Sequence, residues 1–293
     1  MTDSERWAME GSDVPSRRRL IQDALLIGGV AVVLAVVHLG LPPATRARLA
    51  FDHGTLDPVT VFTSAFVHVD GRHLLGNVAG YLAAAALAYG LAVQVGRRQW
   101  FRVTFGCFLL GLPVAVGLTS YAILAWQFPG IDPITRGFSG VGAGFVGFVF
   151  VAMLAGIRDA FGARTALFVG LAVWLLLLLE VYVIYAGSLT LTVGVVTAIG
   201  WGFCLWGLLG EVDLADSQWA RYWPALGQVT TVVVFLVLFV AILFPARIVA
   251  DGTVTNVFAH ATGLLYGTAG ATVTYRILPS NSEGSNGKPP FLQ

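Results

Sequence analysis

Three apolar segments of this sequence carry, near their starts, polar side chains that together could perform nucleophilic catalysis. Ser139 follows Gly137 at the start of one segment, His260 lies four residues into another, and His73 and Asn77 open a third. A hydroxyl is a weak nucleophile until a neighbouring base such as imidazole takes its proton. His73 and Asn77 are four residues apart, so a helix stacks them on one face, where both can donate hydrogen bonds to a developing oxyanion. The pattern predicts a serine nucleophile, a histidine base and an oxyanion site.

Glycines flank the serine and follow the histidine at spacings that favour close helix packing. Gly137 and Gly140 bracket the serine, whereas Gly263 and Gly267 follow the histidine on roughly one helical face. Small residues at such spacings let two membrane helices approach closely, which could bring the imidazole within hydrogen-bond reach of the hydroxyl. Each motif also has a purely structural interpretation, because a serine can cap a helix and a buried histidine can be only a hydrogen-bond partner.

The composition indicates an integral membrane protein built of helices. The 293 residues are 57% hydrophobic and 11% charged, whereas soluble domains average about 25% charged residues. Apolar runs near the ~20 residues that cross a bilayer recur along the chain, and lipid favours helices because their backbone groups are satisfied internally. We expect an all-α polytopic bundle of about eight spans, at residues 22–41, 73–95, 103–126, 139–157, 165–186, 189–210, 225–244 and 256–277.

The basic residues predict the orientation of these spans. If the N-terminus is cytoplasmic, 12 of the 17 Lys and Arg residues fall in cytoplasmic segments and 5 in the other loops, which agrees with the positive-inside rule. The C-terminus is then cytoplasmic too. The second, fourth and eighth spans run in the same direction, so His73, Ser139 and His260 lie on the same extracytoplasmic side. We expect a multi-pass protein of the cell membrane, in contact with the lipid bilayer, whose polar sites share one shallow depth.

The remaining residues that could do chemistry give weaker indications. His38 and His53 have no evident partner, and His68, upstream of the second span, is assigned only a supporting role. Glu180 is the one acid well inside a span, and its late position in the fifth span would let it reach the outer interface. The two cysteines are expected to be free thiols in apolar runs. We expect no metal and no cofactor, and the net charge of +1 gives no sign of nucleic-acid binding.

In combination, the ordered motifs resemble those of the rhomboid family of intramembrane serine proteases. The matching segments, each on its own span, are His73-x-x-x-Asn77, Gly137-Phe138-Ser139-Gly140 and Ala259-His260-x-x-Gly263-x-x-x-Gly267. The resemblance implies a six-helix core in which Ser139 is the nucleophile and His260 the general base, with no aspartate. It also implies that the side chains of Asn77 and His73 and the Ser139 N–H hold the oxyanion. Substrates would be membrane proteins, cleaved in or near a transmembrane helix.

The chain departs from this resemblance in several respects. The family core has one helix between the serine and histidine helices, whereas three spans lie between them here, and Ala143 stands where some members carry an aromatic residue. Two added spans preserve the direction of the last one, so the pair can still form. We expect a cytoplasmic segment 1–21, a rhomboid-like protease domain 22–278 with two extra helices, and a disordered tail 279–293. Alternatives are an inactive rhomboid-like protein that binds membrane clients, and a membrane transporter.

Overall fold

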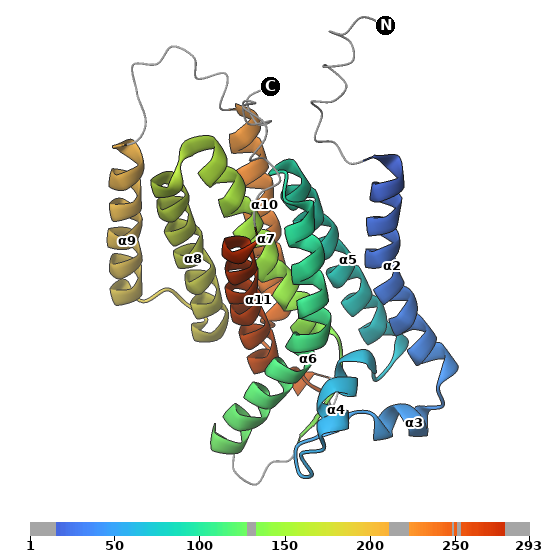
Figure 1. Ribbon diagram of the computed structural model, residues 1–293. Helices are drawn as coiled ribbons and strands as arrows, with labels where there is room; N and C mark the ends of the chain where they lie inside the picture. Colours follow the sequence, from blue (N-terminus) through green and yellow to red (C-terminus); the bar gives the residue numbers. More distant parts are fainter. Residues whose placement is uncertain (1–15, 128–132, 211–222, 248, 251–252, 279–293) are drawn as a thin grey trace, which may run out of the picture.

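The computed structural model describes residues 16–127, 133–210, 223–247, 249–250 and 253–278, most of which are helical (Figure 1). The long helices of this part are α2 (Arg17–Gly40), α5 (Gly71–Gln94), α6 (Arg98–Gln127), α7 (Ser139–Phe161), α8 (Ala163–Ala186), α9 (Leu191–Leu209), α10 (Trp223–Leu243) and α11 (Val257–Ile277). Each predicted span is one of these helices, which confirms the all-α polytopic bundle. α2 begins at Arg17, so the predicted N-terminal segment 1–21 is partly helical, and the predicted tail 279–293 lies outside the described residues.

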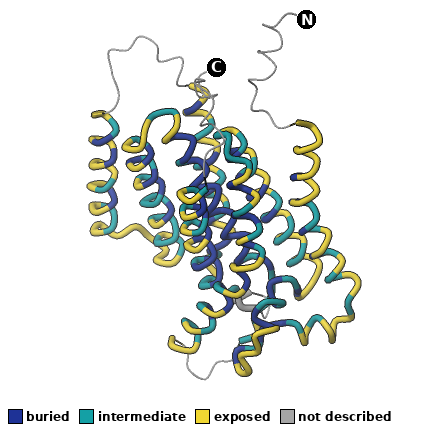
Figure 2. The backbone as a smooth tube through the Cα atoms, in the orientation of Figure 1, coloured by how far each residue is buried: buried dark blue, intermediate teal, exposed yellow. Residues whose placement is uncertain are grey.

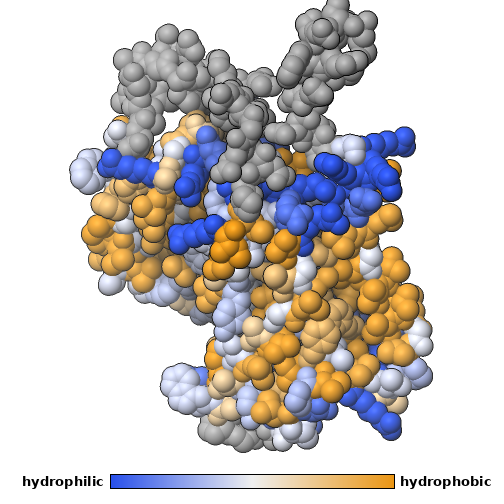
Figure 3. Space-filling view, viewed as in Figure 1, coloured by the Kyte–Doolittle hydropathy of each residue, from blue (hydrophilic) through white to orange (hydrophobic). Residues whose placement is uncertain are grey.

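The helices have the length and composition of membrane spans. Seven of them, all except α11, are long and apolar enough to cross a membrane. α11 has 21 residues, which is sufficient in length. Its threonine hydroxyls are satisfied without water, because Thr262, Thr268, Thr272 and Thr274 each donate to the carbonyl four residues earlier. Figure 3 shows apolar residues over the middle of the visible face and hydrophilic residues gathered along its upper part. The chain is a multi-pass membrane protein.

α7 lies at the centre of the bundle. Residues 140–153 of this helix are all buried, and α5, α6, α8, α10 and α11 pack around it (Figure 2). A helix that is apolar on every side can be covered on every side. Its Phe145 and Phe148 meet the rings of Tyr81 on α5 and of Trp100 on α6, with centroids 5.3 Å and 4.7 Å apart. The first residue of α7 is therefore held by a rigid, surrounded element.

The segment between α2 and α5 is a folded layer at the end of the bundle where α5, α7 and α11 begin, here called the site end (Figure 1). It contains α3 (Pro43–Arg48), β1 (Phe51–Asp52), α4 (Pro58–Thr63) and the short 3-10 helix η1 (Ser64–Phe66). β1 pairs antiparallel with β2 (Ile134–Thr135), with Phe51 opposite Thr135. This pairing ties the layer to the segment that leads into α7. A second pair, β3 (Val249–Ala250) with β4 (Thr253–Val254), lies between α10 and α11.

A buried ion cluster joins α2, α5 and α6 at the opposite end. The carboxylate of Asp23 is fully buried and accepts from Arg98 Nε at 2.5 Å and Nη2 at 2.9 Å. It also accepts from the Tyr89 hydroxyl at 2.8 Å, and Arg102 Nε lies 3.6 Å away. Buried charge is tolerated when it is paired and hydrogen-bonded in this way. This role of Asp23 was not predicted from the sequence.

The three helices between α7 and α11 differ in their distance from the centre. α8 packs on α7, α9 and α10, and α10 packs on both α7 and α8. The principal contact of α9 among the described elements is with α8, and Figure 1 shows α9 at the edge of the bundle. α9 is therefore peripheral, whereas α10 belongs to the set around α7.

Candidate active site

Ser139 and His260 are hydrogen-bonded to each other at the site end. His260 Nε2 lies 2.8 Å from Ser139 Oγ. Ser139 is the first residue of α7 and is half-buried, whereas His260 lies in the first turn of α11 and is buried. The structure thus brings together the two residues that the sequence analysis predicted as nucleophile and base.

The hydrogen bond of the second ring nitrogen of His260 defines the tautomer of the imidazole. Nδ1 lies 2.5 Å from the backbone carbonyl oxygen of Leu243, at the end of α10. A carbonyl oxygen can only accept, so Nδ1 carries the hydrogen of the neutral ring. Nε2 is then unprotonated and accepts from the Ser139 hydroxyl. In this arrangement the imidazole can take the proton of the serine as it attacks. Leu243 was not predicted, because a backbone acceptor leaves no residue-type signal.

Backbone packing of α7 on α11 sets the distance between the serine and the histidine. These two helices make the most extensive contact of any pair of described elements. A Cβ on Gly263 would overlap the carbonyl oxygen of Gly140, and a Cβ on Gly267 would overlap the backbone of Gly144. Both contacts advance by four residues, so the helices run parallel in one register. The predicted motif glycines on both helices lie at this contact, where only glycine permits such an approach.

The turn into α7 depends on the fourth motif glycine, Gly137. Its φ of +119° lies in the region that favours glycine. A Cβ there would stand 2.8 Å from Cε1 and 2.9 Å from Nε2 of His73. The Gly137 N–H donates to the Ser64 carbonyl at 2.9 Å. The next residue, Phe138, is buried between rings of η1 and α5. These contacts fix the point at which Ser139 enters its helix.

The predicted oxyanion residues lie on α5 and face the segment that leads to Ser139. His73 packs on Gly137, and Asn77 Oδ1 would lie 3.8 Å from a Cβ there. Asp70 caps α5 by accepting from the His73 N–H at 2.8 Å. Asn77 Nδ2 donates to the His73 carbonyl at 2.8 Å, while its Oδ1 is buried without a hydrogen-bond partner among the described residues. One amide hydrogen of Asn77 is thus engaged within α5, and the second is left to donate.

His68 is buried behind His73 and supports it by packing. The two ring centroids are 5.2 Å apart in an edge-to-face arrangement. Burial, with smaller contributions from the charges of His73, His38 and Arg46, lowers the pKa of His68 to about 3. His68 is therefore neutral near pH 7. His38 has a partner that the sequence did not reveal, because its Nδ1 lies 2.6 Å from Arg46 Nη1, which also donates to the His68 carbonyl at 3.1 Å.

Asn256, which was not predicted from the sequence, positions the histidine helix. Its Oδ1 accepts from the Ala259 N–H at 3.1 Å and caps α11. Its Nδ2 donates to Ser120 Oγ on α6 at 2.6 Å and lies 3.4 Å from Thr135 Oγ1 on β2. Thr135 is in turn 2.9 Å from His53 Nε2, so His53 also has a partner. The available signal was an asparagine just before an apolar run, which is typical of a helix N-cap.

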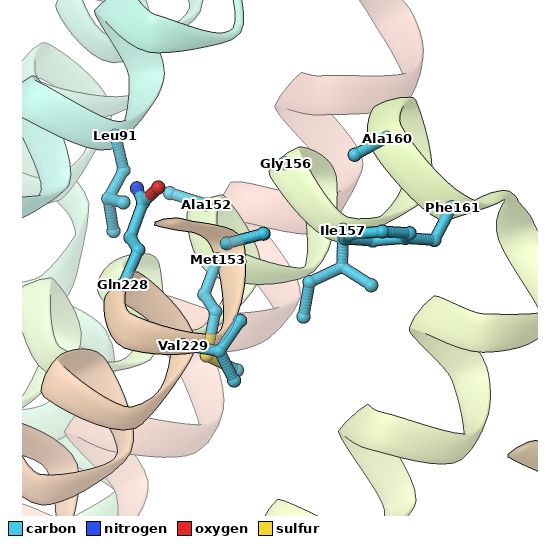
Figure 4. A pocket seen from close by; sticks show the side chains of 10 residues that line it. Leu91, Ala152, Met153, Gly156, Ile157, Ala160, Phe161, Gln228 and Val229 are labelled. Carbon is cyan, nitrogen blue, oxygen red and sulfur yellow. The ribbon is translucent and has the colours of Figure 1, made fainter. Parts of the chain in front are cut away.

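Three further features lie away from Ser139 and His260. Glu180 is on α8, and its Oε2 is buried without a hydrogen-bond partner in the described part of the chain. The thiols of Cys107 and Cys204 are free, as predicted. An apolar crevice between α5, α7 and α10, lined in part by Leu91 and Met153, lies toward the ends of α5 and α7 remote from Ser139 (Figure 4). No serine or histidine lines it, so the crevice is separate from the candidate site.

Comparisons with protein families, with curated proteins and with solved structures find no match to this chain. Its function is therefore inferred from the contacts of its own residues.

Proposed function

We propose that this chain is an intramembrane serine endopeptidase of the rhomboid type, which cleaves transmembrane segments of membrane proteins. The observation that carries the proposal is the 2.8 Å hydrogen bond between Ser139 Oγ and His260 Nε2 within a bundle of membrane-spanning helices. A hydroxyl that donates to an unprotonated imidazole nitrogen has the geometry required for nucleophilic acyl transfer. The reaction needs no cofactor.

Each step of this reaction can be assigned to a residue of the site. Ser139 Oγ attacks the scissile carbonyl carbon while His260 Nε2 takes the hydroxyl proton. The Ser139 N–H stands at the N-terminus of α7, where backbone N–H groups lack helical partners and favour negative charge. With donors from His73 and Asn77, it stabilises the oxyanion. His260 then protonates the leaving amine as the C–N bond breaks. Water, deprotonated by His260, hydrolyses the acyl-enzyme and restores Ser139.

The location of the site fits a membrane-protein substrate. Ser139 is half-buried at the start of its helix, which leaves the water needed for hydrolysis a short path from the bilayer surface. The basic residues favour the extracytoplasmic surface for this end. The backbone of a substrate helix is already hydrogen-bonded, so the scissile segment has to unwind first. Glycine or proline near the cleavage site lowers the cost of unwinding.

The test compares wild-type protein with Ser139→Ala in cleavage of a reporter membrane helix and in labelling by a fluorophosphonate probe. We expect the variant to stay folded and to lose both activities. Ser188→Ala is the matched control, because this serine is exposed between α8 and α9, and both activities should persist. Unchanged labelling of Ser139→Ala would refute the proposal. A folded wild-type protein that captures the reporter without cleaving it would favour an inactive binding protein instead.

A further inference from the structure

The C-terminal end of α10 lies against the imidazole of His260. Pro245 has no N–H and disfavours a helical conformation in the residue before it, so α10 ends at Leu243. Carbonyl groups in the last turn of a helix lack helical partners. The Leu243 carbonyl is one of these, and it accepts from His260 Nδ1 at 2.5 Å. The Leu243 carbonyl, which has no partner within the helix, is thus hydrogen-bonded by the candidate base, His260.

We propose that this helix end is the third member of the catalytic unit, in the place of the carboxylate of a Ser-His-Asp triad; the inference rests on the proposed protease function. In such a triad the carboxylate accepts from Nδ1, holds the tautomer and stabilises the imidazolium. The Leu243 carbonyl accepts from the same nitrogen. The carbonyl end of a helix also carries roughly half a negative charge. It therefore favours the imidazolium that forms when Nε2 of His260 takes the Ser139 proton.

No carboxylate competes for this position in the described part of the chain. The only hydrogen-bond partners of His260 there are the Leu243 carbonyl and the serine hydroxyl. The direction of the carbonyl is fixed by packing, because α10 buries Val232, Leu236 and Val240 along one face and packs on α7 and α8. Residues four apart form one stripe. A rotation of α10 that turned the carbonyl away from the imidazole would expose this stripe.

Phe244, the residue after α10, supports the imidazole from the same side. Its ring centroid lies 6.4 Å from that of His260, at an interplanar angle of 86°. The Phe244 side chain is buried. On the α7 side, Ala143 offers only a methyl group, whose carbon would lie 3.2 Å from a Cβ on Gly263. The aromatic ring that packs on His260 therefore belongs to the residue that follows α10 and not to α7.

Conversion of the amide between Leu243 and Phe244 into an ester tests this role. The ester is introduced by incorporating the α-hydroxy acid analogue of phenylalanine at position 244. An ester carbonyl is a weaker acceptor than an amide carbonyl, so the hydrogen bond from the imidazolium of His260 to Leu243 is weakened. Because a hydrogen bond to a charged group is stronger than one between neutral groups, kcat should fall about tenfold or more. KM should be unchanged, because only the transition state depends on the imidazolium. If the Leu243 carbonyl positions the base, kcat should fall while KM stays the same. A merely structural contact would not give this result.

The matched control is the same ester at Phe239, in the same helix. It also removes one helical N–H but leaves the Leu243 carbonyl an amide, so its kcat should stay within about twofold of wild type. Equal rates for the two esters would overturn the inference. Phe244→Leu, compared with Phe235→Leu, tests the ring contact in the same assay, and only the former should lower kcat.

A second measurement reads the proton of His260 without using activity. The ¹⁵N NMR signals of histidine-labelled protein, assigned by their loss in His260→Asn, should show Nδ1 protonated and Nε2 unprotonated in the resting protein. The opposite tautomer would overturn the inference even in an active protease. Conversely, the expected tautomer in a wild-type protein that neither cleaves the reporter nor labels with the probe would refute the proposed function.

Discussion

Gly147→Ala should separate α7 from α11 and break the serine–histidine contact. A Cβ on Gly147 would lie 2.5 Å from the Leu264 carbonyl oxygen and 2.6 Å from the Thr268 nitrogen, both backbone atoms of α11. To restore a contact of 3.4 Å, the helices must move apart by about 0.9 Å at this level. A rigid-body separation of the same size along the Ser139–His260 line would lengthen this hydrogen bond from 2.8 Å to about 3.7 Å, which is beyond hydrogen-bond reach.

Two quantities follow from this displacement. Loss of a positioned general base costs about 10²–10⁴-fold in rate, so cleavage of the reporter helix should fall at least about 100-fold. Overpacking of a close-packed contact costs about 1–3 kcal/mol, so the free energy of unfolding should fall by that amount. Cleavage rate, rate of fluorophosphonate labelling and thermal unfolding in the same lipid or detergent measure both effects.

Gly142→Ala is the matched control in the same helix. Nothing outside the local helix lies within 4 Å of a Cβ at this position, so the substitution creates no overlap. Removing a helical glycine stabilises a compatible site by about 0.4–1 kcal/mol, and cleavage should be close to that of wild type. If Gly147→Ala cleaved as fast as Gly142→Ala, backbone contact between α7 and α11 would not be what holds Ser139 against His260.

Two other substitutions separate stability from activity. Asp23→Ala removes the partner of the Arg98 guanidinium, whose side chain is only 18% exposed; it should cost about 3 kcal/mol of unfolding free energy while the folded fraction still cleaves. An unchanged melting temperature would show that the cluster is not stabilising. Gly137→Ala strains a φ of +119° and pushes a Cβ to 2.8 Å from His73, so probe labelling should be lost even in protein that remains folded. Normal labelling would contradict the proposed role of this turn.

The residues that could be predicted from the sequence are polar residues within apolar segments. Polar side chains such as Ser139 and His260 stand out in apolar spans, and the direction of successive spans requires that their helices begin at the same end. The motif glycines were visible for a related reason, because their spacing matches a helix face. Span boundaries followed from the ~20-residue requirement of the bilayer.

The residues that the sequence did not reveal act through backbone atoms or through partners distant in the chain. The Leu243 carbonyl is a backbone group, so no residue type marks it. The contact of Asn256 with Ser120 joins residues far apart in the sequence and cannot be seen until the chain is folded. Asp23 stands close to several arginines in sequence, yet its partner is Arg98 on another helix. Gly147 was not recognised because a single glycine does not show which residue of another helix lies opposite it. Its contact with α11 follows only from the parallel packing of α7 on α11.

The three helices between α7 and α11 differ in how they bear on the candidate site. A hairpin of two helices returns the chain to the same side of the membrane, so α11 keeps its direction. α9 packs principally on α8 and not on the helices that carry the site. α10 reaches the imidazole through Leu243 and packs on both α7 and α8. Of the three intervening helices, α10 is therefore the one that contacts the candidate site, and α8 braces it. Substitutions on the outer face of α9 should accordingly change stability more than cleavage.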